Sequence, residues 1–149
     1  MTLSDLEALK GLSIQRGSVY FMRFYPSDGV RPKNPGDKYR DKYFVILGKD
    51  DEGNLVALSL INTEINESLY NRIGPYQHLL YSSDYSFLKG KDRYVDCYQF
   101  KDVSVLRIVQ YGEYIGTLSD EDMEAVLGLV AASPTAIPAR LRQFSITYK

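Results

Sequence analysis

The sequence has 149 residues, 44% of them hydrophobic and 25% charged, which predicts a single globular domain, residues 1–149, with a core of ordinary size. The net charge of −1 excludes an overall basic character that would bind nucleic acid or lipid head groups, although a local basic patch stays compatible with it. One cysteine and one histidine exclude an intrachain disulfide and a zinc site made of cysteines and histidines, so no metal site is expected.

Residues 1–16 are predicted to form a helical extension ahead of the first strand. The stretch SDLE at residues 4–7 fits a capping box and places a short helix over residues 4–10. Acidic residues stand where a signal peptide carries a basic region, and no apolar run approaches the roughly 20 residues of a membrane span. We therefore expect a cytoplasmic protein without membrane contact.

The first strand is expected at residues 18–25, SVYFMRFY, because β-branched and aromatic residues dominate it. Both faces are largely apolar, which predicts a central strand, and Pro26 ends it because proline cannot donate to a ladder. Residues 26–41 then form a long loop rich in proline and glycine. With Lys42, its basic residues make this the most basic segment of the chain: Arg31, Lys33, Lys38 and Arg40. A solvated loop is the simplest interpretation, and contact with a polyanion is the alternative.

A hairpin follows, with strands at residues 42–48 and 55–62 joined by an acidic turn that contains Gly53. The second strand ends abruptly in polar residues, Asn62, Thr63, Glu64 and Asn66. This polar end either leaves the core or presents a site. A second loop runs to Pro75, and residues 78–80 are expected to form a short strand before a turn at residues 83–88.

Two further strands are predicted at residues 93–99 and 103–110, followed by a linking loop with the sequence YGEYIGTLS. Ser119 then caps a helix that reaches about Ala132, because apolar residues recur every three to four positions in it. A last edge strand is expected at residues 142–148. The pattern as a whole predicts a mainly β protein, a small antiparallel barrel or strongly bent sheet with a C-terminal helix packed on it. Its core spans residues 17–132 and is followed by a segment at 133–149.

Five stretches, taken in order, resemble the PemK/MazF toxin family, whose fold is an SH3-like barrel. The opening strand is RGSVYFMRFYPSDG, and the hairpin strands are KYFVILG and GNLVALSLINTEIN. The later part is RYVDCYQFKDVSVLRI, followed by GTLSDEDMEAVLGLV. The resemblance covers roughly residues 17–132 and depends on the order and spacing of these pieces.

The resemblance implies a metal-independent endoribonuclease without a cofactor, which forms a homodimer, cleaves single-stranded RNA and is silenced by an antitoxin protein. The 2′-hydroxyl of the RNA is the nucleophile, so the protein positions it, moves protons and stabilises negative charge. The family's catalytic arginine falls on Lys42 and its catalytic Thr/Ser falls on Thr63. Because lysine lacks the planar fork of arginine, Arg40, two residues earlier on the same strand face, is a candidate to substitute for it. The candidate RNA contacts are Arg31, Lys33, Lys38, Asn62 and His78.

Two other functions stay open. One is a binding module on the same barrel that has lost cleavage, since one fold hosts many functions. The other is an assembly protein, for example from a mobile element, in which the 13 tyrosines form an oligomer interface. Simpler roles are also open for single residues: a half-buried His78, an Asp96 that hydrogen-bonds backbone at the barrel rim, and a buried apolar Cys97.

Overall fold

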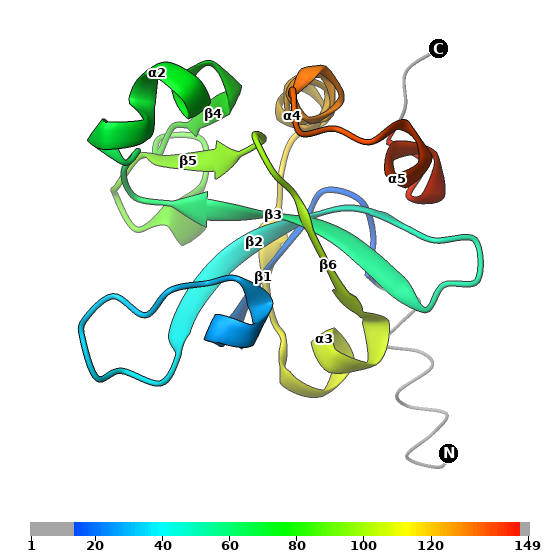
Figure 1. Ribbon diagram of the computed structural model, residues 1–149, viewed down its shortest axis with the longest axis horizontal. Helices are drawn as coiled ribbons and strands as arrows, with labels where there is room; N and C mark the ends of the chain where they lie inside the picture. The colour runs from blue at the N-terminus through cyan, green and yellow to red at the C-terminus, as the bar shows by residue number, and fades with distance from the viewer. Residues whose placement is uncertain (1–13, 147–149) are drawn as a thin grey trace.

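The computed structural model describes residues 14–146, and seven antiparallel strands in this part of the chain form one sheet that curls into half a barrel (Figure 1). The helix expected at residues 4–10 lies outside the described residues. The strands are β1 (Ser18–Phe24), β2 (Arg40–Lys49), β3 (Leu55–Asn62), β4 (Gln77–Leu80), β5 (Arg93–Asp96), β6 (Lys101–Ser104) and β7 (Glu113–Thr117). The prediction of a mainly β, barrel-like antiparallel sheet is confirmed.

The sheet has the order β4-β5-β3-β2-β1-β7, and β3 pairs along both of its edges. One edge of β3 pairs with β2. The other edge pairs first with β6, through Leu55–Leu58, and then with β5, through Ile61 and Asn62. This order brings the end of β3 next to the start of β2 and next to β5.

β1 has neighbours on both sides, β2 and β7, as its two apolar faces predicted. Val19 and Met22 are both buried although they point to opposite faces of the strand, so the sheet separates two apolar clusters. Apolar residues on each face of a central strand therefore explain why this segment is placed inside the sheet.

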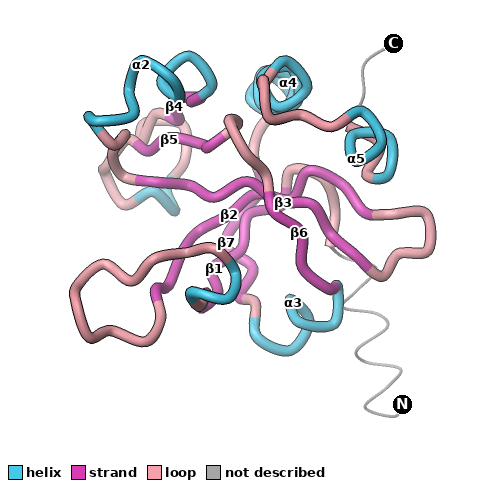
Figure 2. Tube along the Cα trace, in the orientation of Figure 1, coloured by secondary structure: helices cyan, strands magenta, loops and turns pink. Residues whose placement is uncertain are grey.

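Helices cover both faces of the sheet (Figure 2). On one face lie α4 (Asp120–Ala132) and α5 (Pro138–Gln143), and on the other lies α3 (Val105–Tyr111). The predicted stripe of α4 is confirmed, because its buried side chains are Met123, Val126, Leu127 and Val130. Leu141 and Phe144 join the same cluster, so the segment after residue 132 contributes to the core.

Short turns complete the chain between the strands. The loop from Asn62 to β4 contains α2 (Tyr70–Ile73), which stands at the upper left of Figure 1. In the described part of the chain, 3-10 turns lie at Pro26–Asp28, Glu67–Leu69, Gly74–Tyr76 and Ser86–Leu88. None of the helices within residues 14–146 has the length and apolar character that a membrane crossing requires.

The prediction of a strand at residues 103–110 is wrong after Ser104, where α3 begins. The hydroxyl of Ser104 accepts a hydrogen bond from the amide of Arg107 (3.2 Å) and thereby caps α3. β-branched residues favoured a strand here, but of this helix only Ile108 is fully buried, as one face of a short helix allows.

Two more expectations near the C-terminus are corrected. The predicted loop at residues 111–119 contains β7, because Glu113–Thr117 pair with the free edge of β1. The predicted strand at residues 142–148 is, in its described part, the end of α5 and the turn after it. Pro138 starts that helix, where its missing amide hydrogen costs nothing.

Gly48 provides a test of how the C-terminal segment packs on the sheet. It lies at the irregularity in the β2–β3 register, and a Cβ added to it would overlap the backbone oxygen of Phe144. We expect Gly48→Ala to lower the free energy of unfolding by about 1–3 kcal/mol, because the backbone must shift to make room. Urea denaturation measures this.

Gly128→Ala in α4 is the matched control, because nothing lies within 4 Å of its added Cβ and alanine favours the helix. Equal stability of the two variants would contradict the tight contact between Gly48 and the turn after α5.

Candidate functional site

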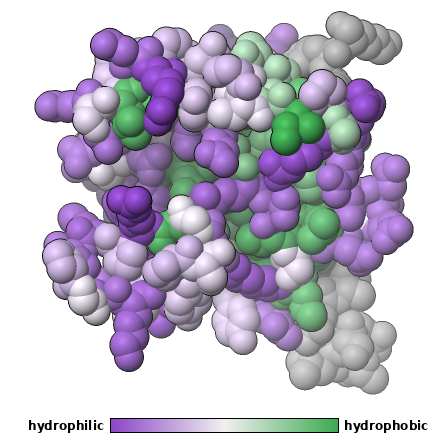
Figure 3. Space-filling view, viewed as in Figure 1, coloured by the Kyte–Doolittle hydropathy of each residue, from purple (hydrophilic) through white to green (hydrophobic). Residues whose placement is uncertain are grey.

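The ends of β2, β3 and β5 surround an open pocket of about 710 Å³. Polar residues dominate its lining, and polar surface also covers the left side of the space-filling view, over the loop before β2 and around α2 (Figure 3). The lining residues come from the strand ends and from the loop after β3: Arg40, Asn62, Thr63, Glu64, Ile65, Asn66, Glu67, Ile73, Gln77 and Asp96.

Lys42 lies directly behind this pocket and is 7% exposed. Its ammonium group donates a hydrogen bond to Oδ1 of Asn62, which lines the pocket. Because an ammonium group can only donate, the amide oxygen of Asn62 must face Lys42, and the Nδ2 donor is turned away from it. Lys42 therefore fixes the orientation of a donor at the pocket wall.

Burial lowers the pKa of Lys42 to about 8, and the positive charges of Arg40 and Arg93 act in the same direction. The carboxylate of Asp96 opposes them. At neutral pH most molecules therefore hold a buried positive charge behind Asn62. Because burial and the neighbouring positive charges bring its pKa to about 8, this charge is sensitive to pH in a range where surface lysines are not.

Asp96 presents a carboxylate at the opposite wall. Its Oδ1 accepts hydrogen bonds from Nε2 of Gln77 (2.9 Å) and from the amide of Tyr98 (3.0 Å). Gln77 stands opposite Asp96 in the β4–β5 register, which accounts for the contact between them. The carboxylate is thus held in one orientation, as a group that accepts a proton from a bound substrate must be.

The loop that closes the pocket is shaped by Asn66. Its Oδ1 accepts hydrogen bonds from the amide (3.0 Å) and the hydroxyl (2.8 Å) of Ser68, and so caps the turn that starts at Glu67. The polar end of β3 therefore serves both purposes that the sequence left open: it leaves the sheet, and it lines a pocket.

The structure brings together four of the predicted site residues. Arg40, Asn62 and Thr63 line the pocket, and Lys42 lies behind it. The other basic candidates, Arg31, Lys33 and Lys38, are exposed in the loop before β2 and do not line it.

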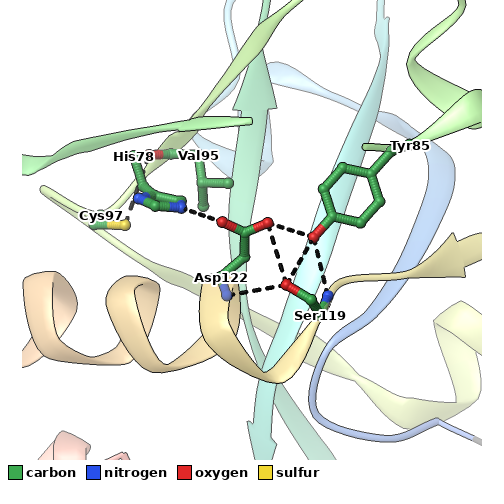
Figure 4. Close-up of polar contacts among 6 residues, drawn as sticks. All are labelled: His78, Tyr85, Val95, Cys97, Ser119 and Asp122. Carbon is green, nitrogen blue, oxygen red and sulfur yellow. Dashed lines mark hydrogen bonds and ion pairs between the residues drawn. The ribbon is translucent and has the colours of Figure 1, made fainter. Parts of the chain in front are cut away.

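His78 lies elsewhere, against α4 (Figure 4). Its Nε2 is 2.8 Å from Oδ1 of Asp122, and the other oxygen of this carboxylate accepts a hydrogen bond from the hydroxyl of Tyr85. Ser119 caps the same helix end and contacts both Tyr85 and Asp122. Burial acts to raise the pKa of Asp122, but the hydrogen bonds from Tyr85 and His78 outweigh it and hold this pKa below its ordinary value. Together these contacts fasten α4 to β4.

Cys97 also lies away from the pocket lining. Its side chain is 1% exposed and contacts the carbonyl of Val95 (3.6 Å, Figure 4). Burial raises the pKa of its thiol, which disfavours the nucleophilic thiolate. Within residues 14–146, no three His, Cys, Asp or Glu side chains gather in a way that could hold a metal ion.

The sequence provided little reason to assign two residues of the pocket, Asp96 and Gln77, to a functional site. Alternation along β5 places Asp96 and Val95 on opposite faces, which marks Asp96 as the polar member of the pair. The sequence did not reveal the register of β4 and β5, and without it Gln77 cannot be matched to Asp96.

Comparison with known proteins assigns no family to this chain. No family model matches it, and no curated protein matches it at a significant level.

The buried charge of Lys42 predicts an unusual pH dependence of stability. Between pH 8 and its ordinary pKa of 10.5, the unfolded state holds a proton on Lys42 that the folded state has released. The free energy of unfolding of the wild type, measured relative to Lys42→Met, should therefore rise across this range, by up to about 3 kcal/mol. Urea denaturation of both proteins at pH 7 and pH 10 measures it. A difference that does not change with pH would contradict the burial of this charge.

The depressed pKa of Asp122 predicts a dependence of the same sign, with stability rising with pH, but in the acid range. Its contribution to stability is complete above the ordinary value of 3.8 and is lost as the pH falls through the lower folded pKa. At pH 7 we expect Asp122→Asn to be less stable than the wild type by about 1–3 kcal/mol, and the gap to narrow below pH 3.8. Thermal unfolding at several pH values measures the gap. Glu121→Gln, an exposed neighbour, is the control, and an equal loss in both variants would contradict the role of the His78–Asp122–Tyr85 contacts.

Proposed function

We propose that this pocket cleaves single-stranded RNA without a metal ion, as PemK/MazF-like toxins do. One observation carries the proposal: hydrogen-bond donors at the ends of β2 and β3 share a pocket with the fixed carboxylate of Asp96. The donors are the guanidinium of Arg40, the amide of Asn62 and the hydroxyl of Thr63. Cleavage by the RNA's own 2′-hydroxyl needs these two kinds of group, donors for the phosphate and an acceptor for the proton.

The donors stabilise the negative charge that develops on the phosphate. The side chain of Arg40 makes no hydrogen bond or ion pair within residues 14–146, so its planar guanidinium is available for two phosphate oxygens. Lys42 keeps the Nδ2 donor of Asn62 in place and adds a positive charge behind it. In this arrangement Arg40 takes the phosphate-binding role, and Lys42 is a positioning residue.

Asp96 accepts the proton of the 2′-hydroxyl as that oxygen attacks the adjacent phosphorus. The O2′–P bond forms and the P–O5′ bond breaks, which leaves a 2′,3′-cyclic phosphate on one fragment. The departing O5′ takes a proton from water, which reaches the open pocket, and Asp96 returns its proton to solvent. No electrons leave the system, and no metal or cofactor enters the reaction.

The exposed loop before β2 extends the proposed RNA path. Arg31, Lys33 and Lys38 follow the backbone there by electrostatic attraction. His78 has no part in this path, because it contacts Asp122 on the other side of β4 from Gln77. By resemblance, the proposal includes a homodimer, an antitoxin partner and a cytoplasmic location, where RNA substrates occur.

A second function is favoured by the acidic part of the lining. Glu64, Glu67 and Asp96 outnumber Arg40, and carboxylates repel phosphate but attract ammonium and guanidinium groups. The alternative is therefore a binding module that holds a lysine or arginine side chain of a partner protein and cleaves nothing.

Cleavage of a long mixed-sequence RNA in EDTA separates the two functions. We expect the wild type to cut at discrete sites. We expect Asp96→Asn to slow the cutting by roughly a hundredfold or more, because the proton acceptor is lost. Electrophoresis of end-labelled RNA measures the rate.

Glu67→Gln is the matched control, since it removes the same charge from the same pocket and should cut at least as fast as the wild type. No cutting by the wild type on any RNA tested would favour the binding module. Equal cutting by the wild type and Asp96→Asn would remove Asp96 from the mechanism.

A further inference from the structure

A row of side chains in contact crosses the sheet on the face that α4 also covers. The guanidinium of Arg93, in β5, lies 4.9 Å from the ring of Tyr43 in β2. The ring of Tyr43 is 4.8 Å from that of Phe21 in β1. Tyr43 and Phe21 are neighbours in the β1–β2 register and only partly buried, so they form a floor that remains open to solvent.

This floor continues into a second pocket of about 630 Å³, which Phe21 lines. Tyr25 and Tyr111 form its walls and are 43% and 71% exposed. Tyr111 is the last residue of α3, and both Phe21 and Met22 line this pocket, so it lies at the edge of the sheet, where the two faces meet. Beside it, the guanidinium of Arg23 lies 3.5 Å from the ring of Tyr39. We call Phe21, Tyr25, Tyr43, Arg93 and Tyr111 together the aromatic face.

The guanidinium of Arg93 provides a second observation that points to a ligand on this face. Its Nε is buried without a hydrogen-bond partner, and no ion pair to Arg93 exists within residues 14–146. A guanidinium is costly to leave without an acceptor, and its positive charge also acts on Lys42 behind the first pocket. Within the described residues, the guanidinium of Arg93 therefore has no anionic partner, and a phosphate at its outer nitrogens would supply one.

We propose that the aromatic face binds the bases of an RNA strand by stacking, while Arg93 contacts a phosphate of the same strand. The inference rests on the proposed function, because it names how the substrate of that site is held. Aromatic rings interleaved with arginines are the surface on which single strands stack, since every base has a π-face.

The charges on the aromatic face indicate where a base and a phosphate of the RNA strand would bind. Arg23 is paired with Asp41 (3.4 Å), and Arg107 is paired with Asp28 (2.7 Å), so neither is free for a phosphate. Asp41 and the exposed Glu113 line the second pocket. Carboxylates accept hydrogen bonds from the N–H groups of bases, so the pocket takes a base and the phosphate goes to Arg93.

Fluorescence anisotropy with a labelled 2′-O-methyl oligoribonucleotide tests the proposal, because this probe cannot be cleaved through its 2′-oxygen. We expect Tyr111→Ser to weaken binding by roughly tenfold, as the loss of one stacked base implies. Arg93→Gln should reduce the salt dependence by about 0.7 in the log–log slope, which corresponds to one phosphate. The same backbone without bases should bind the wild type and Tyr111→Ser equally.

Tyr114→Ser is the matched control, because Tyr114 is a tyrosine that is 58% exposed, contacts the ring of Tyr20 and does not line the second pocket. Binding by Tyr114→Ser should equal that of the wild type. Because the probe cannot be cleaved, its binding is measured independently of cleavage, which separates a failure of this inference from a failure of the proposed function.

Unchanged binding by Tyr111→Ser would overturn the proposal. So would a Tyr111→Ser protein that turns from dimer to monomer in sedimentation with its RNA affinity intact, because the aromatic face would then be an interface between two copies.

Discussion

The burial of Lys42 is the constraint on which the rest of the site depends. An ammonium group removed from water must find an acceptor, and Asn62 provides it from the neighbouring strand. This contact decides which way the Asn62 amide points and places a positive charge behind the pocket wall. The nearby positive charges of Arg40 and Arg93 make the burial of this charge less favourable. The anionic ligand of the proposed function would offset that cost.

The sheet explains how distant segments reach this pocket. β3 pairs with β2 and β5 at the same end, so residues 40, 62 and 96 meet although the chain between them is long. The contacts of Asp122 with His78 and Tyr85 fasten α4 to β4, the strand that also supplies Gln77 to Asp96. The chemistry proposed for the pocket therefore depends on a scaffold in which the only histidine has a structural role.

The sequence predicted the elements whose evidence is local. The turn around Gly53 and the apolar period of α4 lie within a few residues, and both elements are found. The sequence analysis missed β7 because this strand forms by pairing with the edge of β1, which is distant in the sequence. It missed α3 because the cap provided by Ser104 outweighs the strand preference of the β-branched residues that follow. Thr63 and Lys42 came from the resemblance, and the pocket that joins them follows from the strand order. The sequence could not single out Asp96 and Arg93 as functional residues. The role of Asp96 depends on the β4–β5 register, and that of Arg93 depends on the absence, within residues 14–146, of a hydrogen-bond partner for its Nε.

The most direct measurement uses an RNA that carries a single 2′-deoxynucleotide at a mapped cleavage site. If the substrate's own 2′-hydroxyl attacks the phosphorus, cutting at that one position should stop while other sites in the same molecule are cut as before. Cutting at the deoxy position at the unmodified rate would show that another nucleophile acts. It would contradict the chemistry proposed for Arg40, Asn62, Thr63 and Asp96.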